Sequence, residues 1–182
     1  MDSGRKVEAE IMSILLETDR LIITEMTMDM AMDVHQNSLD EDTKRFVPDE
    51  VFETLEDAKE TIEFLISQYG GAEGPLVYAV ITKDGNRNIG YVQLVPIADG
   101  KWEIGYHVAK AFTGKGYATE AVKAFLPVIT KRVGVSEVYG IRLLENAASG
   151  RVLEKCGFET FFTGKGEYHD GIYMISKGVW KA

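Results

Sequence analysis

The sequence predicts a single mixed α/β domain built on a mostly antiparallel sheet. A length of 182 residues suits one domain. Three strand-like segments in the middle of the chain are joined by tight turns, which is typical of an antiparallel meander. The segments after them alternate between the helical period and the strand period. With 45% hydrophobic and 27% charged residues, the chain has the composition of a globular protein, so intrinsic disorder is excluded.

The elements of the first half follow from apolar periodicity and turn residues. Thr54 is a good N-cap with Asp57 three residues later, and Gly70 stops the helix that follows. Asp84-Gly85-Asn86 and Asp99-Gly100 are turn sequences between strands. The expected elements are, in order, a strand at 20–25, helices at 29–38 and 55–69, and strands at 76–82, 89–95 and 102–108.

The second half begins with a long amphipathic helix. Apolar residues recur at helical spacing over 116–133, and Gly134 closes the helix. Pro127 lies inside it and is expected to kink its second half. A strand at 138–144, a helix at 147–156 and strands at 158–163 and 171–177 complete the chain. The total is about seven strands and four helices.

Residues 1–12 are interpreted as a leader or an added extension, because Met12 directly precedes the first apolar run. Residues 13–182 form the predicted domain. The first dozen residues carry charges where a signal peptide needs an apolar stretch, and no apolar run approaches about 20 residues. A cytoplasmic protein is therefore expected.

Cysteine, histidine and net charge narrow the function classes. Cys156 is the one cysteine, and the three histidines are scattered, so neither a disulfide framework nor a metal site is expected. The formal net charge of −9 argues against nucleic acid or an anionic membrane as the main partner. It favours a cationic substrate, or it serves solubility alone.

The glycine pair in Thr113-Gly114-Lys115-Gly116-Tyr117-Ala118 joins a strand to the long helix. Glycines let a backbone approach a ligand, and the open amides of a helix start favour an anion such as pyrophosphate. The phosphate-loop pattern and the dinucleotide-binding pattern both fail here. A plain loop without a ligand is the alternative.

Three spaced motifs together resemble the GNAT superfamily of acyl-CoA-dependent N-acyltransferases. The motifs are Gly114-Lys115-Gly116-Tyr117-Ala118-Thr119-Glu120-Ala121, Glu145-Asn146-Ala147-Ala148-Ser149, and Val152 through Phe158. Thr18-Asp19-Arg20-Leu21 and Ile104-Gly105-Tyr106 are similar to the ribosomal-protein-alanine acetyltransferase-like (RimJ/RimL-like) branch. The match spans about residues 13–178, and the expected element order agrees with the fold of that superfamily.

The resemblance implies acetyl-CoA as co-substrate, bound in a cleft where the fourth and fifth strands splay apart. The pyrophosphate would lie on the amides from Thr113 to Ala118, and the pantetheine arm would run along the fourth strand. Asn146 would hydrogen-bond that arm, or cap the helix that follows, or do both. The implied cofactor-binding residues are Tyr106, His107, Val108, Thr113, Gly114, Lys115, Gly116, Tyr117, Ala118 and Asn146.

Two residues are the catalytic candidates that the resemblance implies. Glu103 stands where many relatives carry the base that takes the proton of the amine, and Gly105 would leave room for the acyl group. Many members use a tyrosine as general acid, but Leu153 occupies that position. Ser149, one turn beyond Asn146, resembles the hydroxyl found in this branch and is the candidate acid; proximity and orientation without a dedicated acid are the alternative. Glu103 as a solvated carboxylate and Ser149 as a helix cap are the alternatives. His107 is a less favoured base, and Cys156 is interpreted as a core residue.

The function that follows is acetyl transfer to a primary amine by direct attack in a ternary complex. A protein N-terminus, a polyamine, an antibiotic or another small amine is the expected acceptor, bound over 34–52 and near the hairpin 168–171. A non-catalytic acyl-CoA-binding module and a transferase of longer acyl groups are the alternatives. The latter needs a basic residue at the acyl end, and the cleft segment offers none. Dimers are common in this branch, so a homodimer is a further expectation.

Overall fold

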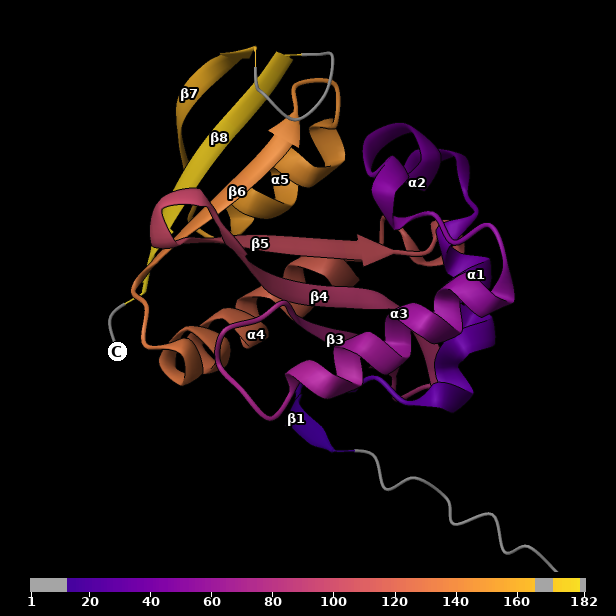
Figure 1. Cartoon of the computed structure of the whole chain (residues 1–182). Coiled ribbons are helices and arrows are strands. Elements are labelled where there is room, and N and C mark those ends of the chain that lie inside the picture. Colours follow the sequence, from indigo (N-terminus) through magenta and orange to yellow (C-terminus); the bar gives the residue numbers. More distant parts are fainter. Residues whose placement is uncertain (1–12, 166–171, 181–182) are drawn as a thin grey trace, which may run out of the picture.

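The computed structural model describes residues 13–165 and 172–180, which form one open sheet with helices on both faces (Figure 1). The strand order is β1-β2-β3-β4-β5-β6-β8-β7. The strands are β1 (Ile14–Glu17), β2 (Leu21–Glu25), β3 (Leu76–Thr82), β4 (Arg87–Ile97), β5 (Lys101–Val108), β6 (Glu137–Leu143), β7 (Glu159–Lys165) and β8 (Ile172–Val179). Neighbouring strands are antiparallel except β5 and β6, which are parallel. The predicted fold class is thus confirmed.

Five α-helices accompany the sheet in the described part of the chain. They are α1 (Ala31–Ser38), α2 (Glu41–Phe46), α3 (Leu55–Gln68), α4 (Tyr117–Val133) and α5 (Ala147–Lys155). Short 3-10 turns are η1 (Met28–Met30), η2 (Pro48–Glu50), η3 (Ala98–Gly100) and η4 (Lys110–Phe112). Figure 1 shows α1 and α3 in front of the sheet and α4 behind it. Accordingly, one core cluster joins α1 and α3 to the sheet, and another joins α4 and α5 to it.

Residues 13–165 and 172–180 contain one strand and one helix more than the seven strands and four helices expected. β1 was not predicted because it has only four residues and pairs with β2 across a register shift. α2 was not predicted because its six residues, EDTKRF, lack an apolar period. Its start is fixed by the Asp40 side chain, which accepts a hydrogen bond of 2.8 Å from the Thr43 amide.

The helix ends that were predicted from capping side chains agree with the structure. Thr54 and Asp57 form the capping box that begins α3. α4 continues through Pro127 to Val133. Pro127 is exposed, so the carbonyl that it leaves without an amide partner can face solvent.

The sheet opens between β5 and β6, as expected for the fourth and fifth predicted strands. β5 pairs with β4 over its whole length, from Lys101 to Val108. Its pairing with β6 is limited to Glu103 opposite Tyr139. Beyond Glu103 the two strands diverge, and the β5 edge from Ile104 to Val108 is left for another partner. The proposed leader 1–12 and the hairpin 168–171 lie outside the described residues.

Candidate functional site

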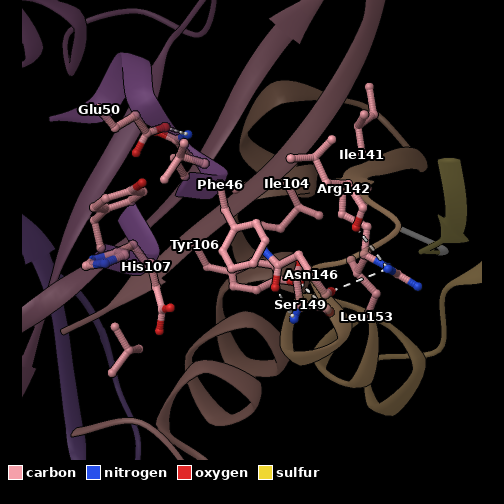
Figure 2. A pocket seen from close by; sticks show the side chains of 18 of the residues that line it. Phe46, Glu50, Ile104, Tyr106, His107, Ile141, Arg142, Asn146, Ser149 and Leu153 are labelled. Carbon is pink, nitrogen blue, oxygen red and sulfur yellow. Dashed lines mark hydrogen bonds between the residues drawn. The ribbon is translucent and has the colours of Figure 1, made fainter. Parts of the chain in front are cut away.

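A cavity of about 210 Å³, here called the splay cavity, lies where β5 and β6 diverge. Most of the predicted site residues meet in it: Glu103, Tyr106, His107, Val108, Thr113, Asn146 and Ser149. Figure 2 shows Glu50 and His107 on one side, Asn146, Ser149 and Leu153 on the other, and Phe46 and Tyr106 between them. α2 and η2 form one wall of the cavity, and β6 and α5 form the opposite wall.

A second cavity of about 280 Å³, the loop cavity, lies between the start of α4 and α5. It shares Val108 and Thr113 with the splay cavity, so the two cavities adjoin. Its lining includes Gly114, Gly116, Tyr117 and Ala118, all of them predicted.

The glycine loop has the backbone that an anion site needs. Gly114 and Gly116 adopt φ of 75° and 81°, which side chains with a Cβ rarely tolerate. Gly116 is the N-cap of α4 and has no side chain to occupy the first-turn amides. Those amides therefore remain open toward the loop cavity at the positive end of the helix dipole.

The segment around Arg20 holds this loop in place, a role that the sequence did not reveal. Arg20 donates from Nε to Glu120 Oε2 at 2.7 Å and from Nη1 to the Lys115 carbonyl at 3.1 Å. Its guanidinium lies 4.5 Å from the Tyr117 ring centroid. Thr18 adds a 2.6 Å hydrogen bond to Glu120. These contacts, 95 to 102 residues apart in sequence, anchor the loop to the start of β2.

The positive charge at the loop cavity comes from α5. Lys115 turns back to its own loop, where Nζ donates to the Ala111 carbonyl at 3.2 Å and lies over Phe112. Its side chain lines neither part of the cleft. Arg151 and Lys155 line the loop cavity instead, one helical turn apart on α5. Their spacing of four residues was the available signal in the sequence.

Glu103 is not a solvated carboxylate. It lies at the point where β5 and β6 separate, and its carboxyl accepts a hydrogen bond from the backbone of Ile141 on β6. Burial is the main cause that raises the pKa of Glu103 to about 7; the hydrogen bond from the Ile141 backbone opposes this rise, and the nearby Glu50 carboxyl adds to it. A carboxyl with a pKa near neutrality is suited to accept and release a proton at physiological pH.

Ser149, Asn146 and Tyr106 form a hydrogen-bonded group on the opposite wall. Asn146 caps α5 by accepting from the Ser149 amide at 3.1 Å. The Tyr106 hydroxyl lies 2.8 Å from both the carbonyl and the Oγ of Ser149. A carbonyl only accepts, so when Tyr106 donates to it, the Ser149 hydroxyl donates to Tyr106. Burial raises the pKa of Tyr106 and keeps its proton in place.

The His107 side chain binds α2 to the sheet. Its Nε2 lies 2.8 Å from Thr43 Oγ1 and 3.3 Å from Asp40 Oδ2, and its ring stacks on Tyr91. Burial lowers the pKa of His107, while the Asp40 charge opposes that shift. Because its ring nitrogen is engaged on α2, His107 supports this wall of the splay cavity.

Gly105 was expected to leave room for an acyl group, but the space beside it is occupied. A Cβ at Gly105 would lie 2.5 Å from Nε2 of Gln93, whose side chain covers this position. Gln93 donates from Nε2 to Glu50 Oε1 at 3.1 Å. Burial raises the pKa of Glu50 to about 7. Gln93 and Glu50 thus form a polar pair beside Glu103 that the sequence motifs did not indicate.

The leucine at the position of the usual tyrosine and a glycine inside α5 both have a packing explanation. Leu153, at the position of the usual tyrosine, is 2% exposed, and its Cδ2 lies 2.6 Å from where a Cβ of Gly140 would be. Gly150 makes room for the Arg142 guanidinium, which donates to the carbonyls of 143, 144 and 146. Arg142 also lines the splay cavity, a basic residue that the sequence had not placed there.

Within residues 13–165 and 172–180, no cluster of three or more histidine, cysteine or acidic side chains has the geometry to bind a metal ion. None of the helices described is long and apolar enough to cross a membrane. Burial raises the pKa of the Cys156 thiol to about 11, so the thiol stays protonated near neutral pH.

Comparisons with known proteins show the family of the chain. Residues 20–159 match the family described as acetyltransferase (GNAT) domain. The N-acetyltransferase YnaD of Bacillus subtilis strain 168 is 29% identical over 173 residues, covering 91% of this chain and 98% of YnaD. The resemblance stated from the sequence is confirmed.

Two solved structures share the fold at low sequence identity. The ribosomal-protein-S5-alanine acetyltransferase of Vibrio fischeri superposes with a TM-score of 0.75 at 16% identity, covering 95% of this chain and 100% of that one. RimL, a ribosomal L7/L12 alpha-N-protein acetyltransferase solved in complex with Coenzyme A, gives a TM-score of 0.77 at 15% identity, covering 92% and 98%. At this level of identity the two neighbours show that the fold is shared.

Proposed function

Since the chain belongs to the GNAT acetyltransferase family, we propose that it transfers the acetyl group of acetyl-CoA to a primary amine by direct attack in a ternary complex. One observation carries the proposal. The splay cavity holds a carboxyl with a pKa of about 7 and adjoins a cavity lined by the start of α4.

The loop cavity fits the pyrophosphate of acetyl-CoA. The amides from Thr113 to Ala118 supply donors, and Arg151 and Lys155 supply positive charge on the facing helix. The free edge of β5 from Tyr106 to Val108 suits an extended arm that pairs like a strand. RimL, which shares the fold, was solved with Coenzyme A. Lys115 contributes through its amide, because its ammonium binds within its own loop.

Glu103 acts as the base in this proposal. An ammonium must lose a proton before its nitrogen can attack, and Glu103 accepts that proton, directly or through one water. The C–N bond forms at the acetyl carbonyl carbon while the C–S bond breaks. The nitrogen loses two protons in all: Glu103 takes the first and releases it to solvent, and the second, lost after the C–N bond has formed, balances the proton that the CoA sulfur gains as a thiol.

Ser149 assists the departure of the sulfur. Its hydroxyl donates a hydrogen bond to the developing thiolate, which requires that it release Tyr106. Tyr106 can then donate to Ser149 Oγ instead of the carbonyl, because both acceptors lie at 2.8 Å. This exchange keeps both hydroxyl protons hydrogen-bonded while the charge develops on the sulfur.

The proposal is tested with the double variant Glu103→Gln/Ser149→Ala. Release of the CoA thiol in the presence of a mixed amine panel should fall by about a hundredfold or more, the size expected on loss of a general base. The Kd of acetyl-CoA, measured by isothermal titration, should stay within about threefold, because neither side chain lines the loop cavity. Glu63→Gln, an exposed change on α3, is the control. Unchanged turnover in the double variant contradicts the proposed roles.

A further inference from the structure

A third cavity, the apolar cavity, has no part in the chemistry described so far. It has a volume of about 420 Å³ and lies on the face of the sheet that α1 and α3 cover, next to η2. Its walls come from α3, from the first residues of β3 and from β4. A cavity of this size is within the range that holds a small organic ligand.

The apolar cavity adjoins the splay cavity. It shares Glu50, Tyr91 and Gln93 with the splay cavity. Val95, another lining residue, lies directly opposite Glu103 in the β4–β5 pairing. Because paired residues on neighbouring strands point to the same face, the apolar wall continues to within one strand of the base. A molecule in this cavity would therefore meet the carboxyl of Glu50 first and that of Glu103 on the neighbouring strand.

The lining combines a hydrocarbon surface with acidic residues at one end. Phe52, Phe64, Leu65 and Val95 are among its apolar side chains. The charged side chains among its described lining residues are Asp49 and Glu50, both in η2. Glu50 is held toward the splay cavity by Gln93. This distribution suits a cationic head at η2 and an apolar body against α3.

We propose that the apolar cavity binds the body of the acceptor, so that the substrate is a primary amine carried on an aromatic or aliphatic group, with Glu50 receiving its ammonium. This rests on the proposed acetyl transfer and adds the substrate class. The amine at Glu50 passes to Glu103, whose pKa the Glu50 carboxyl already raises. A polyamine is a poor fit, because its second ammonium would lose water against an apolar wall.

The inference is tested by comparing amines that differ only in their bodies. Purified protein is given saturating acetyl-CoA and either 2-phenylethylamine, ethanolamine or spermidine, and release of the CoA thiol is followed. The kcat/KM for 2-phenylethylamine should exceed that for ethanolamine by roughly thirtyfold, the gain expected when one aromatic ring is buried. Spermidine should be the poorest of the three. Peptide amides with N-terminal phenylalanine or glycine are assayed in the same way. They show whether the apolar group and the amine are supplied by a small molecule or by the N-terminus of a peptide.

A variant that fills the cavity gives an independent test. Thr61 lines the apolar cavity from α3 and lies on a different element from Glu103, so Thr61→Phe occupies the space without altering the base. The ratio of kcat/KM between 2-phenylethylamine and ethanolamine should fall by about tenfold or more. Thr163→Phe, at an exposed site on β7, should leave that ratio unchanged.

The outcomes separate this inference from the proposed function. Thiol release with ethanolamine at the same kcat/KM as with 2-phenylethylamine overturns the apolar acceptor but leaves acetyl transfer standing. An unchanged ratio in Thr61→Phe, with the variant folded by circular dichroism, also overturns it. No thiol release with any amine, despite acetyl-CoA binding, overturns the proposed function itself.

Discussion

Glu103→Gln should make the protein more stable at alkaline pH while it abolishes the base. Burial raises the pKa of Glu103 from 4.5 to about 7, so the folded protein binds this proton more tightly than the unfolded chain does. Between pH 4.5 and 7, unfolding therefore releases the proton, and the wild type loses stability as the pH rises through this window. Glutamine is neutral at every pH, and its side-chain oxygen can still accept from the Ile141 backbone.

The size of the stability difference follows from the rise in the pKa of Glu103. Each pKa unit corresponds to about 1.4 kcal/mol, so the rise from 4.5 to about 7 amounts to on the order of 3 kcal/mol. Glu103→Gln should match the wild type below pH 4.5 and exceed it by roughly this amount above pH 7.5.

Urea unfolding of both proteins at pH 4.5 and pH 8 measures the difference, and Glu63→Gln on the surface of α3 is the control. In parallel, the kcat/KM of the wild type should rise with pH through about 7, as Glu103 loses its proton. Equal stability of Glu103→Gln and the wild type at pH 8 would refute the buried, raised carboxyl on which the mechanism depends.

Three other predictions address the surroundings of the cleft. Arg20→Ala removes the anchor of the glycine loop, so the Kd of acetyl-CoA should rise by about fivefold or more in titration calorimetry, while the exposed ion pair costs under about 1 kcal/mol of stability; unchanged affinity would show that the loop holds itself. Gly150→Ala places a Cβ 2.7 Å from the Arg142 guanidinium, so thermal stability should fall although alanine is the better helix former. In an Arg142→Ala background, Gly150→Ala should cause no further loss of stability relative to Arg142→Ala alone. A further loss in that background would argue against this contact. Asp40→Asn removes a charge that raises the pKa of His107, which should fall further in an NMR titration; an unchanged or higher value would contradict the pairing.

The sequence predicted the elements whose signals are local. Capping residues, turn pairs and an apolar period placed α3, α4 and the β3–β5 meander, and the glycine pair placed the loop. β1 and α2 were not predicted, because a four-residue strand and the segment EDTKRF have no apolar period. The splay between β5 and β6 came from the family resemblance, since periodicity does not report which strands pair.

The site was predicted where a motif covers it and missed where distant segments meet. Glu103, Ser149 and the glycine loop belong to recognisable motifs, and the structure brings them to one cleft. Arg20 reaches that loop from 95 residues away, and Gln93 covers Gly105 from the neighbouring strand. Such contacts depend on strand register and side-chain direction, which a single sequence does not display.

Acetylation of an amine in the splay cavity with Glu103 as base is the central claim. The most direct measurement incubates the protein with acetyl-CoA and the amine panel and quantifies both the released thiol and the acetylated amine by mass spectrometry. We expect equal amounts of the two products in the wild type, and loss of both by about a hundredfold in Glu103→Gln with acetyl-CoA still bound. Thiol release without an acetylated amine, or an equal rate in Glu103→Gln, would contradict it.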